Sequence, residues 1–172
     1  MRSQYLNMVL LVVSISCVTP KVMYDYDTKE NFDKYKTFNF FIDSGEGLSK
    51  LDIKRVQNSI SDLLIAKGLE QTSDPTFYIN VIAKRQDSRN QNTFGVGLGA
   101  GSHSRFGISG GIPMTSREPM QRLIIDFVAS KNDHVIWQGE LESKVISDMI
   151  PEERDTYYRK ITEKILSKYP PK

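Results

Sequence analysis

Three carboxylates in the last third of the chain are candidates for acid–base chemistry. Glu140 and Glu142 lie two positions apart, and on a strand they share one face with Gln138. Paired carboxylates can act as general acid and base in hydrolysis. Apolar residues alternate with them, so the pattern favours the solvent-facing side of a strand. Asp126, placed between apolar residues, is a candidate buried acid, but the sequence gives it no catalytic partner.

The chain contains two histidines and one cysteine, which is a weak basis for a metal site. His103 lies among serines, and His134 lies in a short polar turn. A serine-type triad also requires a positioned acid and an oxyanion donor, and no such motif occurs. Cys17, the single cysteine, cannot form an internal disulfide. We therefore expect no catalytic residue, no metal ion and no cofactor.

A glycine-rich segment over residues 93–113 is the most unusual part of the sequence. Gly95, Gly97, Gly99 and Gly101 fall at every second position, so an extended strand places all four on one face. A nucleotide-binding glycine loop must lead into a helix, whereas further glycines and prolines follow here. An edge hairpin is the favoured interpretation. The alternative is a flat surface, with Arg105 beside it, that a partner or a lipid approaches closely.

Basic residues are locally in excess between positions 84 and 122, although the whole chain has a net charge of only +2. The segment contains two acids, Asp87 and Glu118, and six bases, which are Lys84, Arg85, Arg89, Arg105, Arg117 and Arg122. Such an excess suits either an anionic membrane or glycan surface, or an ordinary solvated face. The small net charge disfavours nucleic-acid binding.

The first seventeen residues have the parts of a secretory signal peptide. Arg2 precedes an apolar run over residues 8–13, and small residues lead to Cys17. The run is about half of the ~20 residues that a membrane-spanning helix needs. Its end, Ser14-Ile15-Ser16-Cys17, resembles the lipobox of bacterial lipoproteins. This resemblance implies that residues 1–16 are a signal peptide, that the chain is cut before Cys17, that the cysteine carries lipid, and that residues 17–21 form a tether.

The remaining residues, 22–172, suit a single domain in length and composition. Alternation of apolar and polar residues predicts strands over residues 22–27, 37–42, 77–83, 123–130 and 135–145. Asn132 and Asp133 tolerate the left-handed backbone of a tight turn, so the last two strands form a hairpin.

Two segments have the spacing of amphipathic helices. In the first, apolar residues recur at intervals of three and four from Ile53 to Leu64, with Ser49 or Ser44 as the N-cap and Gly68 as the C-terminal glycine. The second begins at Pro151, which two glutamates follow, and ends at Pro170-Pro171. The element order predicts an α+β fold: an antiparallel sheet of about five strands with two amphipathic helices packed on one face.

Several segments together resemble the DUF4136 domain of bacterial envelope lipoproteins. They are residues 24–27 (Tyr-Asp-Tyr-Asp), 31–38 (Asn-Phe-Asp-Lys-Tyr-Lys-Thr-Phe), 64–69 (Leu-Ile-Ala-Lys-Gly-Leu), Asp74-Pro75, 123–127 (Leu-Ile-Ile-Asp-Phe) and 135–139 (Val-Ile-Trp-Gln-Gly). Departures are the long glycine segment and Gln138, where the family often has Arg. The resemblance implies a fold and a location in the cell envelope, and it supplies no activity and no catalytic residue.

We therefore expect a lipid-anchored, periplasm-facing protein of the outer membrane or cell envelope. It would be held to the membrane through lipid on Cys17 and would bind an envelope protein, lipid or glycan without performing a reaction. Two alternatives remain open at this point. One is a hydrolase that acts on envelope polymers through Glu140, Glu142 or Asp126, and the other is a small-ligand or lipid carrier that uses the glycine face.

Overall fold

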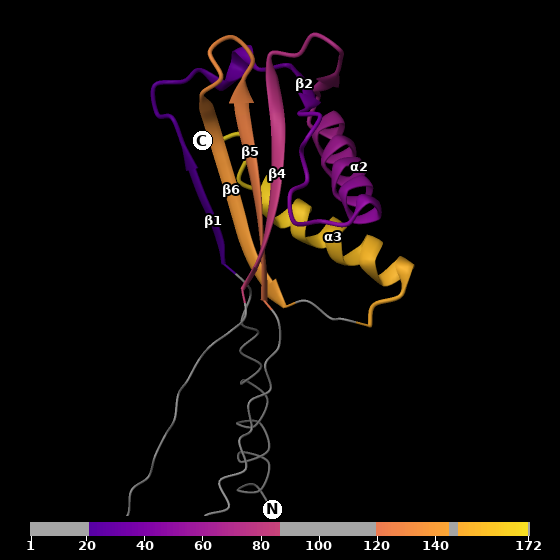
Figure 1. The fold of residues 1–172 in the computed structure, drawn as a ribbon. Coiled ribbons are helices and arrows are strands. Elements are labelled where there is room, and N and C mark those ends of the chain that lie inside the picture. Colours follow the sequence, from indigo (N-terminus) through magenta and orange to yellow (C-terminus); the bar gives the residue numbers. More distant parts are fainter. Residues whose placement is uncertain (1–20, 87–119, 145–147, 172) are drawn as a thin grey trace, which may run out of the picture.

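The computed structural model describes residues 21–86, 120–144 and 148–171. In these ranges a six-stranded sheet and two α-helices form an α+β fold, and both helices lie on the same side of the sheet (Figure 1). The elements in chain order are β1 (Val22–Tyr26), the 3₁₀-helix η1 (Phe32–Lys34), β2 (Thr37–Phe40), α2 (Lys50–Ala66), β3 (Glu70–Gln71), β4 (Phe77–Gln86), β5 (Met120–Ala129), β6 (Val135–Lys144) and α3 (Pro151–Leu166). No helix in the described part of the chain has the length and apolarity needed to cross a membrane.

The spatial order of the strands is β1-β6-β5-β4-β2-β3. The predicted α+β class and the β5–β6 hairpin are confirmed, and the strand beyond the expected five is the two-residue β3. The sheet is mostly antiparallel, as predicted, and at one edge β2 runs parallel to both β4 and β3. β1 and β2 also do not pair with each other, since β1 joins β6 at the opposite edge. β2 ends at Phe40, two residues before the predicted end.

The core lies between the helices and one face of the sheet. Alternate residues of the long strands point toward the helices and are buried: Phe77, Ile79 and Val81 from β4, Leu123, Ile125 and Phe127 from β5, and Trp137 and Leu141 from β6. The Phe127 ring is central, with its centroid 4.8 Å from that of Phe77, 4.9 Å from Trp137 and 4.7 Å from Tyr169. Each such side chain contributes roughly 1.5–3 kcal/mol through burial, so this layer holds the helices on the sheet.

The helix boundaries follow local capping chemistry. Ser49, one of the two predicted caps, accepts a hydrogen bond from the Asp52 N–H at 3.2 Å, and Gly68 follows the end of α2 with φ of +87°. α3 begins at Pro151 as predicted, and Glu153 accepts a hydrogen bond from the Ile150 N–H at 3.1 Å. α3 ends at Leu166, before Pro170-Pro171, where the sequence predicted its end.

The segment between β2 and α2 runs along β4 and fixes where α2 begins. The other predicted cap, Ser44, is buried here and accepts a hydrogen bond from the Val81 N–H at 3.0 Å. Gly47 has φ of +80°, and a Cβ at this position would lie 2.0 Å from the Ala83 carbonyl oxygen. Only glycine fits such a contact, so Gly47 holds the start of α2 against the strand.

Substitution of Gly47 by alanine should destabilise the fold more than the same change at Gly68. Both glycines have positive φ, but a Cβ on Gly68 would meet no atom within 4 Å. Gly68→Ala is expected to lower the free energy of unfolding by about 1–2 kcal/mol, the cost of a left-handed backbone alone. Gly47→Ala should cost a further ~1–3 kcal/mol through the clash. Urea titration of both variants measures the difference, and equal losses would contradict the close contact.

Candidate functional site

A cleft of about 630 Å³ opens where the N-termini of α2 and α3 meet the ends of β4 and β5. The two helices converge here because both pack on the same face of the sheet (Figure 1). The polar and aromatic lining residues are Ser49, Asp52 and Arg55 from the start of α2, Arg85 and Gln121 from the strands, and Arg154, Tyr157 and Tyr158 from α3. Leu48, Leu51 and Met149 add apolar surface to its walls.

Asp52 is the organising residue of the cleft and is only 4% exposed. One carboxylate oxygen accepts a hydrogen bond from Arg55 Nη1 at 3.0 Å, and the other accepts from Arg154 Nη1 at 3.0 Å. Ser49 Oγ donates a further hydrogen bond to this carboxylate at 2.8 Å. A buried charge with this many donors is well compensated, so Asp52 ties the first turn of α2 to the first turn of α3.

Among the described residues that line the cleft, three arginines stand against the one carboxylate of Asp52, so this lining is positively charged. The Arg85 residue is exposed, and the Arg154 side chain is 33% exposed, so both can contact a ligand. The two helix N-termini add partial positive charge, which favours an anion at this point. Planar guanidinium groups bind carboxylates and phosphates through paired hydrogen bonds. The arrangement therefore suits an anionic group.

The tyrosines of the cleft stay protonated and act only as neutral hydrogen-bonding groups. Burial, and after it the nearby carboxylate of Asp52, raises the pKa of Tyr158 to about 12. Burial also raises the pKa of Tyr157, whose hydroxyl lies 2.8 Å from Ser143 Oγ. Together with the exposed Leu51, these groups give the cleft the mixture of Arg, Tyr and apolar side chains that is common in the centre of binding interfaces.

The carboxylates singled out from the sequence lie elsewhere, on the face of the sheet turned away from the helices. Glu140 and Glu142 both lie beside Arg122, at 4.0 Å and 3.9 Å from its guanidinium nitrogens. Asp126 is 9% exposed and accepts a hydrogen bond from Gln138 Nε2 at 2.7 Å. Burial raises the pKa of Asp126, although the Gln138 hydrogen bond opposes the shift. Each of these acids thus has a structural partner.

The remaining predicted site residues fall outside the described part of the chain. These are the lipidation candidate Cys17, the partner-surface candidates Gly95, Gly97, Gly99, Gly101 and Arg105, and also His103. Of the six bases between residues 84 and 122, the structure describes Lys84, Arg85 and Arg122. It places Arg85 in the cleft and Arg122 beside the two glutamates.

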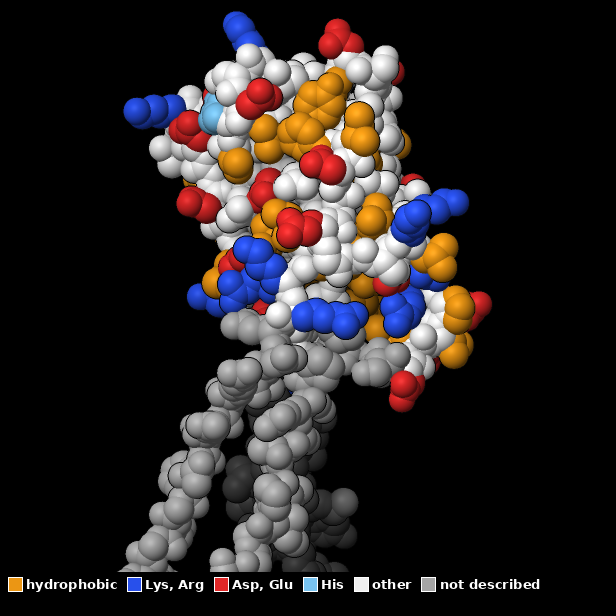
Figure 2. Space-filling view, in the orientation of Figure 1, with side chains coloured by type: hydrophobic (Ala, Val, Ile, Leu, Met, Phe, Trp, Pro, Cys, Tyr) orange, Lys and Arg blue, Asp and Glu red, His pale blue; other side chains and the backbone are white. Residues whose placement is uncertain are grey.

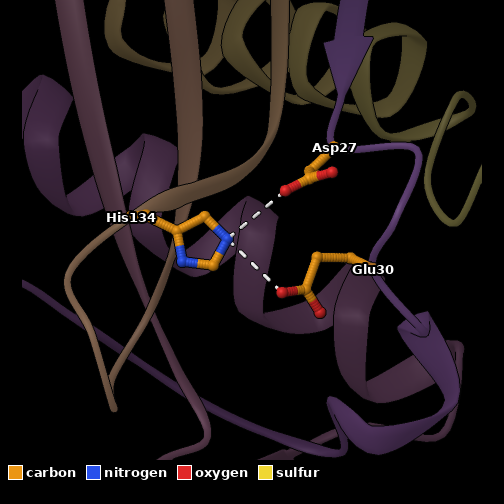
Figure 3. A group of neighbouring side chains, drawn as sticks. All are labelled: Asp27, Glu30 and His134. Carbon is orange, nitrogen blue, oxygen red and sulfur yellow. Dashed lines mark ion pairs between the residues drawn. The ribbon is translucent and has the colours of Figure 1, made fainter.

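Asp52, Arg55 and Arg154 were not predicted from the sequence. A signal for Asp52 was present, because Ser49 followed three residues later by an acid resembles a capping box. The partnership with Arg154 gave no signal, since the two residues are 102 positions apart. From the sequence His134 was predicted only as a turn residue, whereas the structure places it beside Asp27 and Glu30, and the three side chains offer donors for a metal ion (Figure 3).

The fold and the cleft define a small α+β domain with one helical layer over a mixed sheet. The sequence matches the family described as "Domain of unknown function (DUF4136)" over residues 22–171. The chain therefore belongs to the DUF4136 family. No curated protein matches the sequence.

Solved structures with the same fold include a PDZ domain protein from Parabacteroides distasonis, with a TM-score of 0.59 and 18% identity. That match covers 89% of this chain, and the chain spans only 36% of that protein's length. Two structures of a PelC dodecamer from Paraburkholderia phytofirmans match with a TM-score of 0.51 and 9% identity, over 87% of this chain and 95% and 96% of theirs. At these identities the similarity concerns the fold.

Asp52→Asn should destabilise the protein, because the buried carboxylate that joins the two helices loses its charge. We expect the free energy of unfolding to fall by about 2 kcal/mol, the value of charge-assisted hydrogen bonds in a buried position. Asp155→Asn is the matched control: it also removes a partner of Arg55, at 2.6 Å, but its side chain is 63% exposed. That control should cost less than ~1 kcal/mol. Denaturant titration compares the two, and an equal loss would show that Asp52 does not join the helices.

Proposed function

We propose that this protein is a lipid-anchored module of the bacterial cell envelope that faces the periplasm, binds an anionic envelope component in the Asp52 cleft, and performs no reaction. The observation that carries the proposal is the composition of the cleft. Three arginines and two protonated tyrosines surround one compensated acid. Such a set binds an anion well but offers no free carboxylate or imidazole as a general base.

The proposed anchor restricts how far the domain stands from the membrane. Five peptide units separate Cys17 from Val22, the first residue of β1. Five residues span at most about 18 Å even when fully extended. Lipid on Cys17 would therefore hold the end of the sheet where β1 begins close to the headgroups.

That end of the sheet is basic. Lys84 and Arg122 are paired across β4 and β5, and Arg85 is the next residue toward the end of β4. Arg122 also lies beside Glu140 and Glu142, whereas Lys84 and Arg85 are exposed. Lys21 precedes β1, whose first residue Val22 pairs with Leu141. Figure 2 shows Lys and Arg side chains gathered at this end of the domain. Each basic residue near an anionic leaflet contributes about 1 kcal/mol, so the charge would orient this end toward the membrane.

The cleft opens beside the same end, because Arg85 and Gln121 line it from the strand ends. A component reaching the cleft there would present a phosphate or a carboxylate close to the lipid surface. An envelope protein, a lipid headgroup and a charged glycan all carry such groups, and the vesicle experiment below tests binding to the lipid surface.

Metabolic labelling tests the anchor. Cells that express the native chain in the presence of radiolabelled palmitate should incorporate label into the protein, and a Cys17→Ala form should incorporate none. The variant should also leave the membrane fraction, because the remaining electrostatic attraction is too weak to hold it at high salt. An unlabelled native protein, or a Cys17→Ala form that stays fully membrane-bound, would contradict the proposed anchor.

Binding to vesicles tests the orientation of the domain. Residues 17–172 with Cys17→Ala, the proposed mature chain without its lipid, should bind vesicles that contain phosphatidylglycerol and should not bind purely zwitterionic ones. Arg85→Gln should weaken this binding about fivefold, which corresponds to ~1 kcal/mol for one basic residue at the surface. Lys131→Gln is the control, because Lys131 lies in the turn between β5 and β6 at the other end of the sheet. Co-sedimentation measures both, and equal losses would refute the orientation.

A further inference from the structure

A second group of polar side chains lies at the end of the sheet opposite the cleft. Asp27 follows β1, Glu30 precedes η1, and His134 ends the turn between β5 and β6 (Figure 3). The imidazole Nε2 lies 3.7 Å from an Asp27 carboxylate oxygen and 3.4 Å from a Glu30 carboxylate oxygen. The three donor atoms all lie within 4.8 Å of one another.

The backbone on both sides of this group is fixed by the sheet. The Asp27 N–H donates to the Ile136 carbonyl at 3.0 Å, which extends the β1–β6 pairing by one residue. The His134 carbonyl accepts from the Ala129 N–H at 2.9 Å, and Asp133 takes the positive φ of 52° that the turn requires. The donor atoms therefore come from segments held in place, as a preorganised site requires.

Each carboxylate is also oriented by a hydrogen bond on the oxygen that faces away from the imidazole. The Lys29 N–H donates to Asp27 Oδ1 at 2.9 Å, which leaves Oδ2 toward His134. On Glu30, Oε2 accepts from the Tyr35 hydroxyl at 3.1 Å and pairs with Lys34, which leaves Oε1 toward His134. Outer hydrogen bonds of this kind orient metal ligands in proteins.

The spacing suits a tetrahedral ion. A zinc ion with nitrogen and oxygen ligands at 2.0–2.2 Å separates neighbouring ligand atoms by about 3.3–3.6 Å. The two separations from Nε2, 3.4 Å and 3.7 Å, are close to this range, and the Asp27 and Glu30 oxygens lie within 4.8 Å of each other. One imidazole and two carboxylates are ligands that zinc accepts, and an Mg²⁺ or Ca²⁺ site would consist of oxygens alone.

We infer that Asp27, Glu30 and His134 bind one zinc ion, with the fourth position left to water or to a donor from a partner protein. The ion would join the segment after β1 to the β5–β6 turn, so it would stabilise the edge strand β1. A protonated His134 paired with both acids is the competing arrangement, and it needs no metal. The two differ in their response to added zinc at neutral pH, where an imidazole ligand is neutral.

Zinc titration of the full-length Cys17→Ala form tests the inference, since this form contains no thiol that could bind the metal. Calorimetry should find one equivalent of bound Zn²⁺ at pH 7.5, and zinc should raise the thermal midpoint. His134→Gln should weaken zinc binding by about 100-fold or more. Loss of a residue that only orients a ligand already lowers metal affinity by up to about 100-fold, and His134 would be a ligand itself. His103→Gln, the same change at the other histidine, should leave the affinity unaltered.

A spectroscopic readout separates this site from weak surface binding. Co²⁺ added in place of zinc should give the intense visible absorption of tetrahedral cobalt in the parent protein and in His103→Gln, and it should not do so in His134→Gln or Glu30→Gln. Absence of binding at one equivalent, or affinity and spectra that survive His134→Gln, would overturn the inference. The thermal midpoint of each variant is measured with and without zinc. If His134→Gln or Glu30→Gln lowers the midpoint but zinc does not raise the midpoint of the parent protein, the three residues form a metal-free ion pair and the zinc site is refuted.

Discussion

The fold depends on the burial of one aromatic and aliphatic layer between α2, α3 and a single face of the sheet. Phe127 on the central strand contacts the rings of Phe77, Trp137 and Tyr169, so residues from three parts of the chain must come together for any of them to leave water. Because both helices are held on this face, their N-termini meet at one end of the sheet. The Asp52 cleft is a consequence of that meeting, and Gly47 allows it by letting the start of α2 approach β4.

The two ends of the sheet differ in chemistry. One end has the start of β1, the basic residues of β4 and β5, and the arginine-lined cleft. The other has the β5–β6 turn and the group formed by Asp27, Glu30 and His134. A short lipidated tether before β1 would bring the first end to the membrane and leave the second facing the periplasm. The proposed anion site would then bind its ligand near the lipid surface, and the proposed zinc site would lie at the end of the domain away from the membrane.

Much of the fold could be predicted from the sequence, because alternation and helical spacing report which residues are buried together. The two helices, the start of α3 at Pro151 and the β5–β6 hairpin followed from these local signals, and the structure chose Ser49 over Ser44 as the cap of α2. The partners of β1 and β2 could not be predicted, since alternation identifies the faces of a strand and says nothing of its neighbours. The same limit hid both sites: Asp52 meets Arg154, and Asp27 meets His134, only through long-range packing. Glu140 and Glu142, the pair that spacing made a candidate for chemistry, both lie beside Arg122.

The proposed role of the domain depends most directly on which end of the sheet lies at the membrane. A spin label on a cysteine introduced in place of Lys84 or of Lys131 can report this in the lipidated protein reconstituted into vesicles, because lipid on Cys17 leaves the new cysteine as the one free thiol. Both lysines are exposed, and they lie at opposite ends of the sheet. A nickel-chelating lipid should strongly relax the label at position 84 and barely affect the label at position 131. Equal relaxation at both positions, or stronger relaxation at position 131, would contradict the proposed orientation.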